Sequence, residues 1–425
     1  MEEPLPGTSA ETSTKDEPDP ELIFINFSRN VDRLIAGGDY GFAVYKTRPE
    51  DITPRLIFEM SRQPTQKDYM TFVNDILLVE SFPPIHKFAV VFGKIPETLY
   101  FYDAVLKDCT GLTHFTQKIL SVKACTENNY DDLASYVRLI IHPAPPNFSL
   151  LMDLTGEEKP RLVYPESETE GLVAVQSICY LSHSKNVINA HNHPIGALRL
   201  NNQATLLATT SNVSTVIRVY DARTTECLVV FRRGVARSVI VHSMAFSADS
   251  RFLCFTSNTE TVHIFKIEGP IPKELYFCYY LFRSVIVHSM AFSADSRFLC
   301  FTSNTETVHI FKIEGPIPKE LRLEEEIALQ FEARDRDALN PPGWYDYFEQ
   351  TKRAVTDYLA PTRDFASAIL PETANLNVAS LKDVNNKLHV IVAISTRKYF
   401  VFVIKNEGGV ATLIRNERLH SKVLI

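Results

Sequence analysis

The 425-residue sequence lacks long apolar runs, paired cysteines and a strong net charge. No window approaches about 18 consecutive apolar residues, and the N-terminus opens with Glu2, Glu3 and Pro4, so neither a membrane span nor a signal peptide is expected. The seven cysteines occur singly, without a CxxC pair, as is typical of buried thiols in a reducing compartment. Residues 1–21 carry seven acidic side chains against Lys15 and therefore most of the net charge of −7. The remainder is nearly neutral, which argues against nucleic-acid binding.

Residues 1–20 differ in composition from the rest of the chain. They combine Pro, Ser, Thr and acidic residues with almost no apolar side chains. Such a segment cannot bury enough apolar surface to offset the entropy of ordering it. We therefore expect a disordered acidic tail at residues 1–20, followed by one β domain over residues 21–425.

From Leu22 onward, short runs of β-branched and aromatic residues are separated by Gly, Asn, Asp and Ser, which predicts strands joined by tight turns. Groups of three or four such runs occur at 22–47, 75–104, 197–233 and 375–405. Units of this size predict an all-β fold, a β-propeller of WD40-like blades. The repeat is degenerate, because Tyr-Asp pairs stand where the common repeat has Trp-Asp, and Trp344 is the single tryptophan.

Residues 237–275 recur without a change as residues 283–321. An identical copy indicates either a very recent duplication or an alternative or faulty gene model, because divergent blades preserve only a pattern. Without the tail and one copy, the chain length fits a seven-bladed plan. An eighth blade is also feasible, since the extra copy supplies three strands and residues 276–282 could supply a fourth. The alternative is extrusion of one copy, which would expose its apolar faces, so we expect incorporation.

The tetrapeptide Phe231-Arg232-Arg233-Gly234 ends the fourth strand of the blade that begins near Ala197. Adjacent residues of a strand point to opposite faces, so the two arginines are expected to enter separate pockets. Arginine suits an anion site, because its planar guanidinium donates paired hydrogen bonds to phosphate and stays charged. The alternative interpretation is a solvated arginine pair at a turn.

Hydroxyl and basic side chains accompany the two arginines. They are His191, Ser211, Thr215 and Arg218 upstream, and Ser257, Thr261 and His263 one blade later. In each set a Ser and a Thr lie four residues apart around a turn, and a basic side chain follows on the next strand. Hydroxyls, an imidazole and a guanidinium together can bind phosphate, although each Ser or Thr alone is typical of a turn.

These residues resemble a known family. FRRG, the preceding TLLATTSNVSTVIRVYD and the following FSADSRFLCFTSNTETVHIF are similar to the PROPPIN family of autophagy propellers, whose animal members are the WIPI proteins. The resemblance covers most of the chain except the tail and about residues 125–165. It implies a seven-bladed propeller that binds phosphatidylinositol 3-phosphate, and often the 3,5-bisphosphate, at two sites on its rim.

The resemblance also implies which residues form each site. The first would use His191, Ser211, Thr215, Arg218 and Arg232, and the second would use Arg233, Ser257, Thr261 and His263. The second copy repeats the pocket as Ser303, Thr307 and His309, but it has only Arg283 where an arginine pair is needed. That third pocket is therefore expected to be incomplete.

A membrane-inserting loop between the third and fourth strands of the sixth blade is a further implication. The segment in that place is about residues 322–362, and its aromatic tip contains Trp344, Tyr345, Tyr347 and Phe348. Trp and Tyr favour the membrane interface, since each has an apolar body and a polar end. The alternative is that the cluster packs on a neighbouring blade.

Other functions find little support. No GxSxG, HExxH, Walker loop or Gly-rich dinucleotide turn occurs, so neither an enzyme nor a cofactor is expected. His191 and His193 lack a nearby Cys or acidic partner to complete a metal site. A lipid-independent scaffold propeller, which would carry FRRG incidentally, remains the competing hypothesis.

The resemblance implies phosphoinositide membranes and autophagy proteins as partners. The protein partner would be a lipid-transfer protein or a subunit of the conjugation machinery, and no nucleic acid is expected. The protein is then expected to be a cytoplasmic monomer. It would be peripheral on membranes that contain phosphatidylinositol 3-phosphate, at the preautophagosomal structure and endosomes.

Overall fold

The structure is a computed structural model of the chain. It describes residues 22–28, 32–38, 41–47, 52–61, 76–82, 87–93, 95–106, 108–123, 150–155, 159–178, 184–213, 216–232, 239–258, 261–267, 278–281, 287–313 and 365–421. The regular structure in these ranges is β-strand, as the β-branched and aromatic runs predict. Within the same ranges, no helix is long and apolar enough to cross a bilayer.

The described strands form seven sheets, which we number in chain order. Sheet 1 contains β1 (Phe24–Phe27), β2 (Arg33–Gly38), β3 (Gly41–Lys46) and β4 (Arg55–Ser61). Sheet 2 contains β5 (Ile76–Phe82), β6 (Lys87–Phe92), β7 (Ile95–Asp103) and β8 (Asp108–His114). Sheet 3 contains β9 (Asp153–Thr155), β10 (Arg161–Pro165), β11 (Gly171–Ser177) and β12 (Lys185–His191). Sheet 4 contains β13 (Ile195–Leu200), β14 (Leu206–Ser211), β15 (Val216–Asp221) and β16 (Cys227–Arg232).

The remaining three sheets follow in the same way. Sheet 5 contains β17 (Val241–Phe246), β18 (Phe252–Ser257), β19 (Thr261–Lys266) and β20 (Cys278–Leu281). Sheet 6 contains β21 (Val287–Phe292), β22 (Phe298–Ser303), β23 (Thr307–Lys312), β24 (Ala366–Ile369) and the short β28 (Gly409–Val410), which is parallel to β24. Sheet 7 contains β25 (Asn377–Val384), β26 (Lys387–Ile394), β27 (Lys398–Val403) and β29 (Thr412–Arg418).

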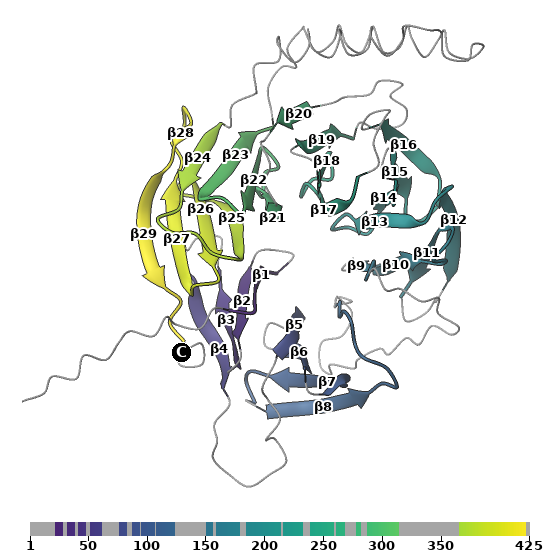
Figure 1. Cartoon of the computed structure of the whole chain (residues 1–425), viewed down its shortest axis with the longest axis horizontal. Helices are drawn as coiled ribbons and strands as arrows, with labels where there is room; N and C mark the ends of the chain where they lie inside the picture. The colour runs from purple at the N-terminus through teal and green to yellow at the C-terminus, as the bar shows by residue number, and fades with distance from the viewer. Residues whose placement is uncertain are drawn as a thin grey trace, which may run out of the picture.

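The sheets stand around a common centre, with the first strand of each sheet inside and the fourth strand at the circumference (Figure 1). The predicted propeller of four-stranded blades is therefore confirmed. Both copies of the duplicated segment are incorporated, as sheets 5 and 6, and β20 supplies the fourth strand of the first copy. The eighth blade is absent from the described part of the chain, because only four sheets precede the first copy.

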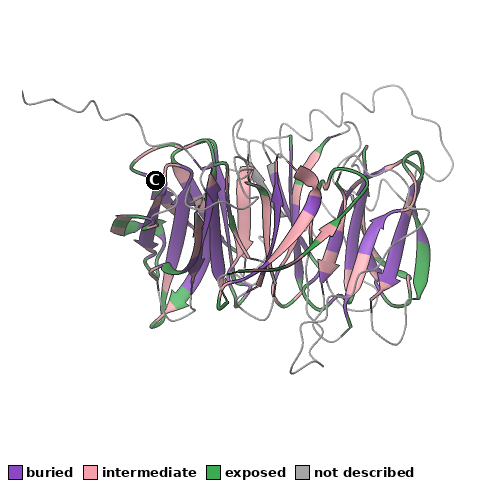
Figure 2. Ribbon diagram, turned by 90° about the horizontal axis from the view of Figure 1, so that it is seen from below, coloured by how far each residue is buried: buried purple, intermediate pink, exposed green. Residues whose placement is uncertain are grey.

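The core lies between the faces of neighbouring sheets, where buried residues run along the strands (Figure 2). The first copy presents Leu253, Phe255 and Phe265 to sheet 4, and its opposite face presents Cys254, Val262 and Ile264 to sheet 6. Leu299, Phe301 and Phe311 of the second copy occupy the positions of the first set and receive that opposite face. One sequence thus carries two complementary faces, so two copies can stand side by side.

The joint between sheets 2 and 3 differs from the others. Among the described residues, apolar clusters fill the joints 1–2, 3–4, 4–5, 5–6, 6–7 and 7–1, but no cluster joins sheet 2 to sheet 3. Residues 124–149 connect these two sheets and lie outside the described residues. The packing that can be described is therefore continuous from sheet 3 around the ring to sheet 2.

Sheets 7 and 1 close the ring without sharing a strand. Their joint buries Leu34, Ile391 and Val401 among other apolar residues. Hydrogen bonds cross it as well, among them those from Lys382 Nζ to the Thr47 carbonyl at 2.6 Å, from the Leu22 amide to the Ser395 carbonyl at 2.9 Å and from Ser421 Oγ to Glu59 Oε2 at 3.0 Å. The first and last sheets are therefore held together by packing and hydrogen bonds, and neither sheet contains a strand from the other end of the described chain.

The identical copies allow a matched test of incorporation. Phe255 and Phe301 are the same position in the two copies, and both are fully buried. Replacing either by Ala should lower the free energy of unfolding by about 3–5 kcal/mol, because each leaves a cavity between two sheets. Urea denaturation of the F255A and F301A variants measures this loss. If F255A lowered the free energy of unfolding and F301A left it unchanged, the second copy would not be packed in the ring.

Candidate functional site

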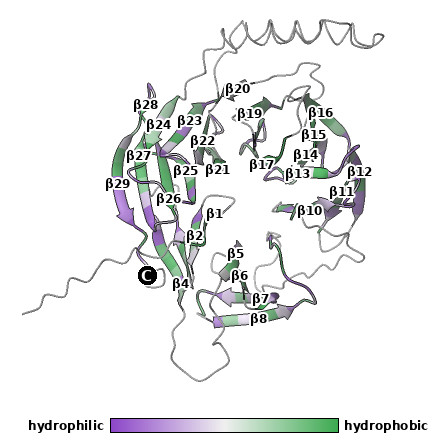
Figure 3. Cartoon of the chain, in the orientation of Figure 1, coloured by the Kyte–Doolittle hydropathy of each residue, from purple (hydrophilic) through white to green (hydrophobic). Residues whose placement is uncertain are grey.

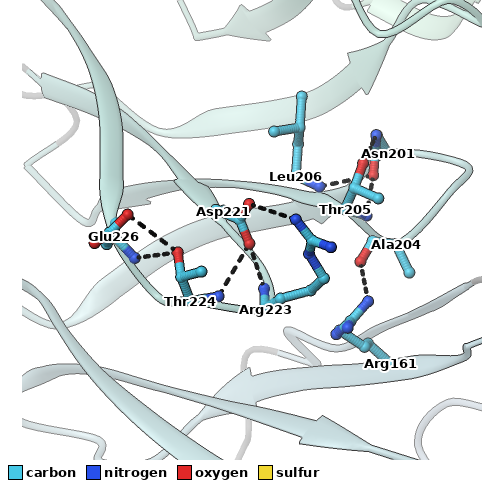
Figure 4. A network of polar contacts seen from close by, with 9 residues as sticks. All are labelled: Arg161, Asn201, Ala204, Thr205, Leu206, Asp221, Arg223, Thr224 and Glu226. Atoms are coloured by element: carbon cyan, nitrogen blue, oxygen red, sulfur yellow. Dashed lines mark hydrogen bonds and ion pairs between the residues drawn. The ribbon is translucent and has the colours of Figure 1, made fainter. Parts of the chain in front are cut away.

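Polar turns fix the ends of the strands in sheet 4 that lie opposite the FRRG end. Asn201 Oδ1 accepts the amides of Thr205 and Leu206 at 2.8 and 2.9 Å, and Asp221 Oδ1 accepts those of Arg223 and Thr224 at 2.7 and 3.0 Å (Figure 4). Asn and Asp favour turns because their short side chains accept such bonds. In addition, Arg161 Nη1 of sheet 3 donates to the Ala204 carbonyl at 2.6 Å. The turns therefore fix this end of sheet 4, and the Arg161 hydrogen bond joins it to sheet 3.

The first candidate site is centred on His191 and Arg218. His191 ends β12 of sheet 3, and Arg218 lies on β15 of sheet 4. Arg218 Nη1 lies 2.8 Å from His191 Nδ1 and donates to the Ala190 carbonyl at 2.8 Å. Gly171 is required beside this strand end, because a Cβ there would lie 2.0 Å from the His191 carbonyl oxygen. Two residues predicted for this site are therefore in direct contact across a joint.

The contacts of His191 fix its protonation state. A guanidinium can only donate, so Nδ1 accepts from Arg218 and carries no proton. The proton is then on Nε2, which donates to Thr209 Oγ1 at 3.0 Å. Burial, followed by the charge of Arg218, lowers the pKa of His191 from 6.5 to about 4. His191 is thus a neutral residue that orients Arg218, and the positive charge of the site resides on the guanidinium.

The other predicted members of the first site are described only in part. Ser211 ends β14 and is buried. The backbone of Arg232 lies opposite Val216, two residues before Arg218 on β15. Thr215 lies outside the described residues, as does the side chain of Arg232. The structure therefore brings His191 and Arg218 together and places the backbone of Arg232 on the neighbouring strand.

The second candidate site lies at the next joint, between sheets 4 and 5. Ser257 ends β18, and His263 on β19 is paired with Phe255; both Ser257 and His263 are buried. His263 stacks on Phe255 with ring centroids 4.6 Å apart, and Phe265 stacks on Phe231 at 4.5 Å. An aromatic column from both sheets therefore supports this pocket. Arg233 and the side chain of Thr261 lie outside the described residues.

The second copy repeats this geometry without the arginine pair. His309 lies against Phe301, with ring centroids 5.3 Å apart, and Ser303 Oγ lies 2.8 Å from Thr305 Oγ1 in the turn that leads to Thr307. Arg232 pairs with Val216, two residues before Arg218 on β15, whereas Leu281 pairs with Thr261, two residues before His263 on β19. In sheet 5 an apolar residue, Leu281, therefore occupies the backbone position that Arg232 occupies in sheet 4.

Two contributors to the first site were missed from the sequence. Thr209, which is fully buried, holds the Nε2 side of His191, and Tyr220 Oη donates to the Ala190 carbonyl at 3.1 Å. A signal existed for Thr209, since it precedes Ser211 by two residues on a strand and so shares its face. The aromatic tip of Trp344, Tyr345, Tyr347 and Phe348, by contrast, lies outside the described residues, as does Arg283.

Acid should destabilise the protein through His191. Its pKa is lower in the folded chain, at about 4, than its ordinary value of 6.5. Neutral His191 therefore stabilises the fold above pH 6.5, and this contribution is lost as the pH falls towards 4, by up to about 3 kcal/mol. Urea denaturation between pH 7.5 and 4.5 measures the loss; in H191Q the pH dependence should be shallower, and equal slopes would contradict a buried neutral His191.

Comparison with known proteins agrees with this architecture. The PROPPIN family model matches residues 123–275 and again residues 269–420, so that each match contains one copy of the duplicated segment. Autophagy-related protein 18 of Caenorhabditis elegans is 26% identical over 97% of this chain and 89% of its own length. WD repeat domain phosphoinositide-interacting protein 2 of Mus musculus is 27% identical over 94% of this chain and 77% of its own length.

Solved structures share the fold at low sequence identity. The structure described as the complex of KlAtg21 with the coiled coil of AgAtg16 superposes with a TM-score of 0.57, at 15% identity, over 94% of this chain and 100% of that chain. KlHsv2 with loop 6CD replaced by a Gly-Ser linker gives a TM-score of 0.53 at 11% identity, over 94% of this chain and 99% of that chain. Together with the two family matches, these likenesses show that the chain belongs to the PROPPIN family of β-propellers.

Proposed function

We propose that this chain is a phosphoinositide effector that binds phosphatidylinositol 3-phosphate, and also the 3,5-bisphosphate, at two neighbouring joints of its rim. Family membership makes it a non-catalytic binding protein, as expected from the sequence. The observation that carries the proposal is that Phe231 and Arg232, the first two residues of FRRG, end the outer strand of sheet 4, the sheet that takes part in both candidate sites. Relatives named as phosphoinositide-interacting proteins support the ligand class.

In the first site, Arg218 is the described cation. Both of its contacts within the described part of the chain use Nη1, which leaves the Nε and Nη2 donors for a phosphate. We assign Arg232, Ser211 and Thr215 to the same phosphate, and Arg233, Ser257, Thr261 and His263 to a second one. His191 contributes by holding Arg218 in place and adds no charge of its own.

Two such sites on one rigid ring explain how weak headgroup contacts give firm membrane binding. Once the first headgroup is bound, binding of the second becomes intramolecular, and its effective concentration is high. The protein would thereby be peripheral on membranes that contain phosphatidylinositol 3-phosphate, including the preautophagosomal structure and endosomes. It would recruit autophagy factors there, either a lipid-transfer protein or a subunit of the conjugation machinery.

The duplication alters where a membrane-inserting loop would stand. Residues 314–364 connect β23 to β24 in sheet 6, whereas the second headgroup site lies between sheets 4 and 5. The candidate loop therefore begins one sheet beyond the sheet that carries Ser257 and His263. We infer that the two arginines contribute more to the membrane affinity of this chain than the aromatic tip does.

A lipid-independent scaffold is the second candidate function. The complex of KlAtg21 with a coiled coil of AgAtg16 favours it, because that propeller of the same fold binds a protein helix. The two functions are compatible on one ring, since headgroup sites on the rim leave other surfaces open to a protein. The test of the lipid function must therefore not depend on any partner protein.

Co-sedimentation with phosphatidylcholine vesicles, with and without phosphatidylinositol 3-phosphate, tests the proposal. R232T and R233T should each weaken vesicle binding about tenfold or more, because each removes a charge-assisted contact, and the double variant should lose it. R223T is the matched control, since Arg223 is an exposed arginine of the same sheet at its opposite end. Vesicle binding that is the same with and without phosphatidylinositol 3-phosphate, or the same in the double variant as in the parent chain, would favour the scaffold.

A further inference from the structure

The outer strand of sheet 4 exposes apolar side chains beside the first candidate site. Strand β16 reads CLVVFR; Leu228 is 43% exposed, Val230 is 38% exposed, and Cys227 is exposed as well. Their neighbours Val229 and Phe231 pack instead against sheet 5. The strand therefore buries one side between sheets 4 and 5 and leaves the other side open at the rim.

The register places this open side on the face that carries the first site. Val230 pairs directly with Arg218, and the backbone of Arg232 pairs with Val216, which shares the face of Arg218. A bulge between Val219 and Tyr220 leaves Leu228 as the extra residue of β16, next to Cys227, which pairs with Tyr220. At about 3.3 Å per residue, Val230 and Leu228 lie about 7 and 13 Å from Arg232 along the strand.

The neighbouring outer strand is mixed in character. Strand β12 of sheet 3 reads KNVINAH, and its exposed side chains are Lys185, Asn186, Val187 and Asn189, with Val187 48% exposed. In Figure 3, β12 is the more hydrophilic and β16 the more hydrophobic of these two outer strands. The exposed apolar patch of Leu228 and Val230 thus lies beside a strand with three exposed polar side chains, and the backbone of Arg232 ends the strand that carries the patch.

We propose that Leu228 and Val230 contact the bilayer itself when the first site holds a lipid headgroup. This inference rests on the proposed function, because it takes the headgroup at Arg218 and Arg232 as its starting point. A headgroup bound there brings the membrane surface to the circumference of sheet 4, and these side chains lie on that circumference. Burial of these two side chains among the lipids would add a hydrophobic contribution to the free energy of membrane binding, beside the electrostatic contribution of the arginines.

A membrane is favoured over a protein strand as the occupant for two reasons. Val230 of the patch pairs with Arg218, a cation that suits the anionic surface of a phosphoinositide membrane. The patch is also small, with two principal side chains, whereas a stable protein interface needs a much larger contiguous area. A shallow contact beside a bound headgroup needs no more than such a patch.

The experiment distinguishes contact with the bilayer from binding of the headgroup. The double variant L228T/V230T places a β-branched residue, which suits a strand, at both positions and removes most of the exposed apolar surface. It should bind phosphatidylcholine vesicles containing phosphatidylinositol 3-phosphate about tenfold more weakly than the parent chain. Its affinity for water-soluble, short-chain phosphatidylinositol 3-phosphate, measured by calorimetry, should equal that of the parent.

The matched control is L413T/I414T on β29 of sheet 7, where the two side chains are 39% and 45% exposed but lie far from β16 around the ring (Figure 1). It should leave both affinities unchanged. Unchanged vesicle binding by L228T/V230T, or an equal loss of short-chain binding at an unchanged thermal midpoint, would overturn the inference. A parent chain that binds neither ligand would instead refute the proposed function.

Discussion

The packing of one sheet face against the next is the constraint on which the ring depends. A blade has two apolar faces and cannot bury either alone, so each sheet must find a complementary neighbour on both sides. Sheet 5 shows this directly, with Phe255 and Phe265 towards sheet 4 and Cys254 and Ile264 towards sheet 6. Because the second copy has the same two faces, it creates one new joint and preserves the type of contact on either side of the pair.

The same constraint links the duplication to the number of sheets. Four sheets precede the first copy, two sheets come from the copies and one follows them, which makes seven in the described chain. With a single copy the same strands would make six. The joint between sheets 2 and 3 is also the one that lacks an apolar cluster among the described residues. Within the described chain, the second copy therefore accounts for one of the seven sheets, and the joint without an apolar cluster is a different one, between sheets 2 and 3.

The sequence predicted the blades better than it predicted the contacts of the sites. Strand phrases such as RLIAGG and GFAVYK appear as β2 and β3, because alternation and turn residues are local signals. Sheet 3 was harder to recognise, since β9 has only three residues. The contact between His191 and Arg218 joins two sheets, and Thr209 completes it from a third strand. The spacing of residues along one strand cannot predict a contact of this kind, because the contact depends on how the sheets pack against each other.

Register also explains what the duplicated pocket can and cannot do. The duplicated segment includes the hydroxyl and imidazole residues of the candidate pocket, but the arginines belong to the strand that precedes the segment. In sheet 5 that strand has Leu281 opposite Thr261, where sheet 4 has Arg232 opposite Val216. The phosphate pocket that we propose for such a joint would draw on two neighbouring sheets, so copying one of them would reproduce only half of it. Since His191 is neutral, the anion sites that we propose depend for their charge on Arg218 and on the two arginines of FRRG, and a copied sheet without them does not supply it.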